Sequence, residues 1–351
     1  MEPVDNTIKT LKKYNKLAAI YLLTASVKGQ SNIEMTEPIK EILPRNLYPE
    51  IKENLLLFSN MIDEFVNFGT HVLMWVIQAS KGSDEQMPLT MFLRDLLEKA
   101  DSISTLVKNS NIEPSKIILR SVFELALYIR YLVDDNFEDR SMSFLVCNAR
   151  NKIRINKAFD KKDQSYQTTL KILDKDELFD RSFLDEIPSS EPVINNQYKI
   201  LKLSNYHKYD IEYERTRKKD NRTPNWYRLF NGPRNIKELA EKVDIPFLYE
   251  ILYRKWSENV HGTEIMSGRI VESKNPSLEE GKVNADIIQL NLPKDAQEVT
   301  TYTLLLLLMT FIKLRDQKIK VRNKEITEWY LSIRQEYQII TCKTKFINVK
   351  L

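Results

Sequence analysis

The segment RKWSENVHG, residues 254–262, places an arginine seven positions before a histidine. At about 100° per residue, seven steps amount to about 700°, so Arg254 and His261 share one stripe of an α-helix. Ser257 and Glu258 lie on or beside that stripe, which is therefore too polar to be a buried apolar face. It suits an active site that cleaves RNA, a site that binds a ligand without chemistry, or a polar helix end in which His261 bonds to a backbone carbonyl or to Glu258.

A second polar pair, Arg120 and Glu124, lies within the apolar segment LRSVFELALYIRYL. Their spacing of four residues makes them neighbours on a helix. Apolar residues surround the pair nearly all round, which indicates a central helix, and charges there need partners or line a cavity. The pair is either an ion pair that links helices or part of the same cavity as His261. In the second case Arg120 would hold a phosphate and Glu124 would orient Arg254 or His261.

The elements that position these residues are predicted to be helices. The chain has only 7 glycines in 351 residues and no glycine-rich phosphate loop. Apolar residues recur instead at the 3.6-residue period. The fold class is therefore predicted to be all-α, a multi-helix bundle of long antiparallel helices. The predicted helices cover 8–26, 48–80, 111–135, 137–160, 234–243, 246–261, 296–320 and 323–340.

Two segments depart from the helical pattern. Prolines and charge runs over about 177–233 predict a long irregular basic insertion with short helices. Alternating apolar residues over about 268–293 predict a small β-hairpin on the helical body. We expect an N-terminal helical region over 1–110 and a core over 111–351, which could also form one continuous domain.

Basic residues gather within 150–157 and 215–219, where they could follow an RNA backbone or form ordinary solvated faces. Aromatic residues interleave with the second cluster, and base stacking needs such residues. They are Tyr206, Tyr209, Tyr213, Trp226 and Tyr227.

The bulk composition narrows the class of protein. A net charge of +4 does not by itself indicate nucleic-acid binding. Two distant cysteines and three scattered histidines predict no metal site and no cofactor, and favour a reducing, cytoplasmic location. His71 is expected to lie in the core. The apolar runs 17–27 and 302–312 are shorter than the ~20 residues of a membrane span, so both are predicted to be core helices.

The sequence resembles a family of mostly bacterial helical proteins of unknown function. Its members pair an R-x-x-x-E helix with a later W…G…LA…Y…Y-x-x-x-S-x-x-x-HG block. The residues that match are Arg120, Glu124, Trp226, Gly232, Leu239, Ala240, Tyr249, Tyr253, Ser257, His261 and Gly262. This resemblance covers roughly 110–270 and implies no activity.

More remotely, the arginine–histidine spacing is similar to that of HEPN ribonucleases of toxin–antitoxin and antiphage systems. This resemblance implies metal-independent RNA cleavage in a homodimer, with His261 exchanging protons and Arg254 stabilising the phosphorane. HEPN proteins usually have Asn, Asp or His after the arginine, whereas this chain has Lys255. The other hypothesis is a non-catalytic binding, sensor or scaffold module with a protein partner in a defence operon. The residues expected to bind substrate are Arg120, Glu124, Lys255, Trp226, Arg217 and Lys218.

Overall fold

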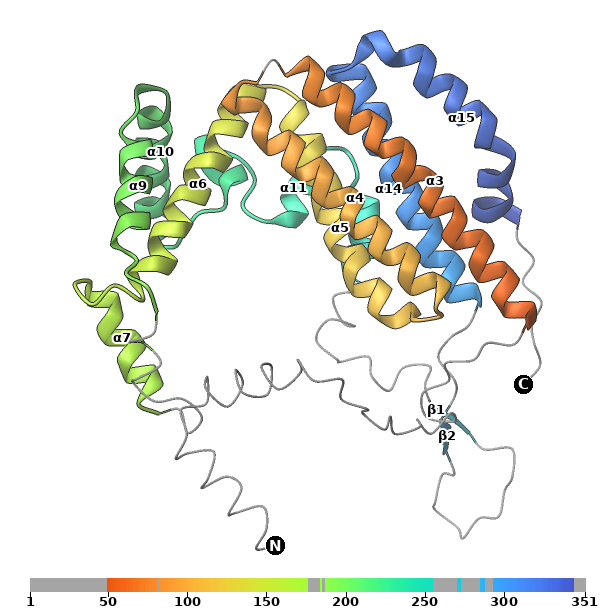
Figure 1. The fold of residues 1–351 in the computed structure, drawn as a ribbon, viewed down its shortest axis with the longest axis horizontal. Coiled ribbons are helices and arrows are strands. Elements are labelled where there is room, and N and C mark those ends of the chain that lie inside the picture. The colour runs from red at the N-terminus through yellow and green to blue at the C-terminus, as the bar shows by residue number, and fades with distance from the viewer. Residues whose placement is uncertain are drawn as a thin grey trace, which may run out of the picture. The chain divides into compact units, whose positions relative to one another are not determined.

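The computed structural model describes residues 49–80, 82–175, 184, 187–254, 270–272, 285–287 and 293–343 (Figure 1). The chain divides into two compact units, and each is considered by itself. Of the described residues, those within 145–219 form the smaller unit, and those within 49–144 and 220–343 form the larger unit. The predicted helix 8–26 and the run 17–27 lie outside the described residues.

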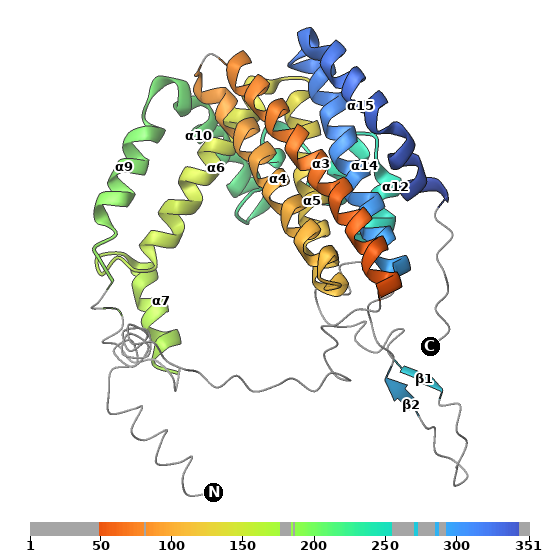
Figure 2. The same ribbon diagram turned by 45° about the vertical axis from the view of Figure 1, so that its right-hand side comes forward.

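Four long helices form the centre of the larger unit. They are α3 (Pro49–Ala79), α4 (Met87–Lys108), α5 (Ile112–Val133) and α14 (Pro293–Gln317). Helices α3 and α5 each pack against both α4 and α14, so the four enclose one core (Figure 2). Apolar side chains at helical spacing supply that core. Those that are almost fully buried include Leu55, Phe58, Ile62, Phe65, Leu89, Leu93, Leu96, Leu119, Val122, Phe123, Val299, Leu304, Leu307 and Phe311.

The prediction of uniformly antiparallel helices is wrong for α14, which runs parallel to α3 and α5 (Figure 1). Near its C-terminal end, Lys313 pairs with Asp134 just after α5, over 2.6 Å. Beyond that end, Arg322 lies over the ring of Trp75 near the C-terminus of α3. Short loops force neighbouring helices to be antiparallel, but residues 134–292 separate α5 from α14, and so long a connection permits a parallel return.

Helix α15 (Asn323–Gln338) covers the α3–α14 side of the core through aromatic contacts. Trp329 stacks on Phe68 at 3.9 Å between ring centroids and donates from Nε1 to Glu64 Oε1 over 2.9 Å. The predicted core helix at 302–312 is confirmed, because this part of α14 contributes fully buried Leu304 and Phe311. Among the described residues no helix is long and apolar enough to cross a membrane. His71, expected in the core, is exposed beside Trp75.

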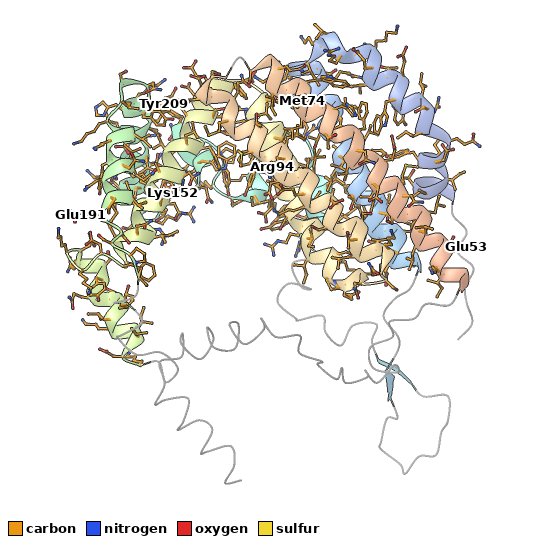
Figure 3. The ribbon with its side chains drawn as sticks, in the orientation of Figure 1. Glu53, Met74, Arg94, Lys152, Glu191 and Tyr209 are labelled. Atoms are coloured by element: carbon orange, nitrogen blue, oxygen red, sulfur yellow. The ribbon has the colours of Figure 1, made fainter. Side chains whose placement is uncertain are left out.

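The range 177–233 was predicted as an irregular insertion with short helices, but from residue 191 to 220 its described residues are largely regular helix, so the irregular character is wrong for that part. Helices α9 (Glu191–Leu201) and α10 (Ser204–Asp220) occupy much of this range, and α7 (Gln164–Leu173) precedes it. Figure 3 labels Tyr209 on α10 and Lys152 on α6 (Phe137–Lys157). The tyrosines of α10 recur at helical spacing, which gives that polar helix a face to bury. Pro192 lies in the first turn of α9, where proline is tolerated.

Helix α4 was not predicted, although its sequence carries the signal. Its buried residues Leu89, Phe92, Leu93, Leu96 and Leu97 follow the i, i+3, i+4 pattern. Helix α7 was not predicted either, and none of its residues is buried. Its N-terminus is marked instead by Asp163, whose carboxylate accepts from the Ser165 amide over 2.9 Å.

The prediction of one α-helix over 246–261 and of a β-hairpin over 268–293 also requires correction. Helix α12 comprises only Pro246–Leu248, and the π-helix η4 (Tyr249–Arg254) follows it directly. The described residues of the predicted hairpin form two three-residue strands, β1 (Ile270–Glu272) and β2 (Ala285–Ile287), paired antiparallel with Ile270 opposite Ile287. The predicted turn and the remainder of both strands lie outside the described residues. The described fold is therefore all-α without a full β-hairpin.

Candidate functional site

Helix α5 presents Arg120, Glu124 and Tyr128 along one stripe, since the three residues follow at intervals of four. The rest of this helix is largely apolar and buried in the bundle, so its rotation about its axis is fixed. Tyr227 comes from the short helix η3 (Trp226–Asn231), and Tyr253 comes from η4. We call these five residues the Arg120 cluster.

Arg120 joins α5 to η4. Its Nη2 donates to the Tyr253 hydroxyl over 2.6 Å, and its Cζ lies 4.2 Å from the centroid of the same ring. Its Nε lies 3.6 Å from Glu124 Oε1, and Tyr128 Oη donates to Glu124 Oε2 over 3.5 Å. The side chains of Arg120 and Glu124 are partly exposed, so the pair lies at the edge of the core and within reach of solvent.

The phenols of the cluster are held protonated. Burial, reinforced by the charge of Glu124, raises the pKa of Tyr227 to about 12 and raises the pKa of Tyr128 further. Burial also raises the pKa of Tyr253, against the opposing effect of the hydrogen bond from Arg120. At neutral pH the cluster therefore contains one cation, one carboxylate and hydroxyl groups that can donate hydrogen bonds. Such a set can bind an anion and orient it, but it contains no strong base.

The π-helix η4 positions the arginine of the opening motif. Tyr249 stacks on Tyr253 with 5.3 Å between ring centroids, and this stack packs toward Arg120. Arg254 is the residue after Tyr253; 75% of its side chain is exposed, and it pairs with Glu250 over 3.1 Å. Glu124 therefore does not orient Arg254. Because η4 has the i→i+5 pattern, the rotation of 100° per residue does not apply up to Arg254.

The remaining residues of the predicted catalytic stripe lie outside the described residues. They are Ser257, Glu258 and His261, and the same holds for Lys255. The structure thus brings together Arg120, Glu124, Tyr249 and Tyr253 of the predicted motif, from segments more than 120 positions apart in the sequence.

Trp226 was predicted to stack on RNA bases, but only 8% of it is exposed. Its ring packs among Phe92, Tyr128, Tyr131 and Phe144 in the larger unit. The tyrosines of α10 are buried as well, in the core of the smaller unit. None of these rings presents an open face for stacking, because packing in the core already covers them.

The predicted RNA-binding cations are largely balanced by acids. Arg217, on α10, pairs with Glu214 over 2.9 Å, whereas Lys218 is exposed. Arg150 forms a two-pronged hydrogen bond with Asp210, at 2.6 and 2.7 Å. Acids three positions away on α10, and Asp210 opposite Arg150, thus neutralise part of both basic clusters, and the residues of α10 resemble an ordinary charged face.

Two members of the Arg120 cluster were not predicted. Tyr128 follows Glu124 by four residues, so the helical spacing could have indicated it. Tyr227 carries no such signal, because only the fold brings η3 to α5. Among the described residues no group of three or more metal-ligating side chains comes together.

The sequence profile of one protein family, described as "Family of unknown function (DUF5677)", matches residues 86–277, which is more than half of the chain. The chain belongs to this family. The DUF5677 match spans α4, α5 and η4 and so includes the whole Arg120 cluster. It also includes the segment 254–262. No curated protein and no solved structure matches the chain.

Proposed function

We propose that this DUF5677 protein is a metal-independent endoribonuclease of the HEPN type, acting as a toxin or antiphage effector. The observation that carries the proposal is that Arg254 is exposed directly after a residue that is fixed to the core. Its guanidinium is mostly exposed at the end of a helix whose preceding residue, Tyr253, is fixed to the core by Arg120. An exposed i, i+4 ion pair such as Arg254–Glu250 contributes only about 0.3–0.5 kcal/mol, so a phosphate can readily replace Glu250.

In this proposal the RNA supplies its own nucleophile. His261 accepts the proton of a ribose 2′-hydroxyl, the 2′-oxygen bonds to the adjacent phosphorus, and the bond from phosphorus to the 5′-oxygen breaks. The leaving oxygen takes up a proton, and the products are a 2′,3′-cyclic phosphate and a 5′-hydroxyl end. Arg254 stabilises the negative charge of the phosphorane, while Arg120 binds a neighbouring phosphate. A homodimer would bring two such segments together.

The test is an incubation of the purified protein with end-labelled single-stranded RNA in EDTA, beside His261→Ala and Arg254→Ala. We expect each variant to cleave about 10²–10⁴-fold more slowly than the unchanged protein. His207→Ala is the matched control, because His207 is an exposed histidine on α10 and should leave the rate unchanged. Absence of cleavage by the unchanged protein, or equal cleavage by His261→Ala, contradicts the proposal. A 2′-O-methylated RNA should resist cleavage.

The second candidate is a non-catalytic module that binds a phosphate-bearing ligand or a defence partner. The observation that favours it is that the Arg120–Tyr253 contact lies wholly among the described residues, whereas Arg254, the first residue of the predicted stripe, is the last residue of the π-helix η4. A partly exposed arginine beside protonated phenols suits anion binding without chemistry.

Thermal unfolding with and without the 2′-O-methylated RNA separates the two candidates. For a binding module we expect the RNA to raise the melting temperature, Arg254→Ala or Arg120→Ala to abolish that rise, and no RNA to be cleaved. For the nuclease we expect His261→Ala to keep the rise and lose cleavage. If the RNA does not raise the melting temperature of the unchanged protein, the protein is not a module that binds RNA.

A further inference from the structure

A cavity of about 660 Å³ lies in the larger unit, away from Arg254, and the proposed nuclease does not use it. Its walls come from α5, the first half of α6, η3 with the loop that follows it, and α11 (Ile236–Lys242). We call it the Trp226 pocket. Its volume is within the range of small-ligand sites, about 300–1,000 Å³. Residues that line it include Tyr131, Arg140, Trp226, Phe230, Glu241 and Lys242.

The loop on one side of the pocket is firmly held. Arg228 is buried, pairs with Asp220 at 2.8 Å, and donates from Nη1 to the Gly232 carbonyl over 2.9 Å. The Gly232 amide donates to the Leu229 carbonyl over 3.2 Å, which closes a four-residue turn. These bonds fix the backbone of Phe230 and Asn231 at the pocket.

Phe230 is held in an unfavourable conformation. Its φ of 56° and the φ of 60° at Asn231 both lie in the left-handed region, where a bulky side chain is rarely found. Phe230 is nevertheless 42% exposed, although a bulky apolar residue held in such a conformation is usually buried. A strained residue with an exposed aromatic ring at a cavity is a feature expected of a binding site.

Polar groups of both signs accompany the aromatic ones. Arg140 donates to the Tyr131 carbonyl and lies 3.9 Å over the Tyr131 ring, so it is already engaged. Glu241 and Lys242, both exposed on α11, form no ion pair or side-chain hydrogen bond with any described residue. One carboxylate and one ammonium group are therefore available to a ligand at this pocket.

We propose that the Trp226 pocket binds a nucleobase of a ribonucleotide, either free or in single-stranded RNA. Phe230 would stack on the base, because every base presents a π-face to an aromatic ring. Glu241 would accept a hydrogen bond from an exocyclic amino group, and Lys242 would pair with the phosphate. The inference goes beyond the proposed nuclease, since it names the group that is recognised and does not require cleavage.

The test measures binding of the four ribonucleoside monophosphates by calorimetry, and of 2′-O-methylated ten-residue RNAs by fluorescence anisotropy. Phe230→Gly is the main variant, since glycine adopts the positive φ without strain and should fold at least as well. We expect it to weaken binding about 5- to 150-fold. The matched control is Phe247→Ala, which removes an exposed aromatic ring that does not line the pocket.

Lys242→Ala supplies the second readout. The unchanged protein should bind a monophosphate more tightly than the nucleoside, and this variant should lose that preference. Lys237→Ala, on the same helix but not at the pocket, should keep it. Binding of RNA but not of free nucleotides, lost in Phe230→Gly, assigns the pocket to RNA, and the reverse assigns it to a free nucleotide.

Two results would overturn the inference: no nucleotide or RNA bound by the unchanged protein, or Phe230→Gly binding as tightly as Phe247→Ala. Neither result decides the proposed nuclease, because its test is the loss of cleavage in His261→Ala, whereas this test uses RNA that cannot be cleaved.

Discussion

The Arg120 guanidinium contacts Tyr253 in two ways at once: it donates to the hydroxyl over 2.6 Å and lies 4.2 Å from the ring centroid. One side chain of α5 thereby holds both the polar and the aromatic part of a residue 133 positions later. This relationship fixes the end of η4, and with it the backbone that leads to Arg254.

Tyr253→Phe should therefore reduce the free energy of unfolding. The variant removes the hydrogen bond to a charged donor but keeps the ring, so we expect a loss of about 1.5 kcal/mol in urea denaturation. Tyr249→Phe is the control, since the Tyr249 hydroxyl forms no hydrogen bond with any described residue. Equal losses in both variants would contradict a specific role for the Arg120–Tyr253 bond.

Gly232→Ala should be strongly destabilising. An added Cβ would overlap the Tyr227 carbonyl oxygen and lie 3.0 Å from the Tyr131 hydroxyl. Because the Tyr227 oxygen belongs to the backbone, it cannot rotate away as the end of a side chain could. We expect a loss of about 1–3 kcal/mol or more, measured by thermal unfolding. Gly69→Ala also brings a Cβ against the end of the flexible Leu97 side chain and to 3.0 Å from Phe311 Cζ, but it meets no backbone atom there, and alanine favours the helix by about 0.5–1 kcal/mol. Gly69→Ala should cost clearly less.

Arg228→Met should reduce the free energy of unfolding, because the largely buried Asp220 carboxylate loses its ion pair with Arg228. Breaking one side of a buried ion pair costs about 3–5 kcal/mol. Arg94→Met is the matched substitution at the exposed pair Arg94–Glu98, where more than half of each side chain is accessible, and should cost less than about 1 kcal/mol (Figure 3 labels Arg94). Similar melting temperatures for the two variants would show that the Arg228 pair does not hold the loop.

Alkaline pH should weaken the fold through Tyr227. Its pKa is about 12 in the folded chain, because burial and then the charge of Glu124 raise it, against about 10 in the unfolded chain. The folded state therefore binds this proton more tightly, so the contribution is complete below pH 10 and is lost as pH rises toward 12. In urea denaturation at several pH values, the free energy of unfolding of Tyr227→Phe should fall less steeply between pH 10 and 12 than that of the unchanged protein. The same slope in both proteins would contradict a raised pKa of Tyr227.

Local patterns in the sequence were sufficient for much of the fold. The bounds of α3, α5 and α15 agree closely with the predicted helices, because an apolar stripe at the 3.6-residue period needs only neighbouring residues to be recognised. The same spacing correctly placed Arg120 and Glu124 beside each other on one helix. It failed at 249–254, where local apolar spacing does not distinguish a π-helix from an α-helix.

The sequence by itself thus determined that the chain is helical and that an arginine and a glutamate lie together on a helix at its centre. Only the tertiary structure decided that Arg120 holds Tyr253, that α14 runs parallel to α5, and that the rings of α10 are buried while Phe230 is exposed. The physical reason is range: helix periodicity follows from contacts three and four residues apart, whereas partners and exposure follow from how distant segments pack together.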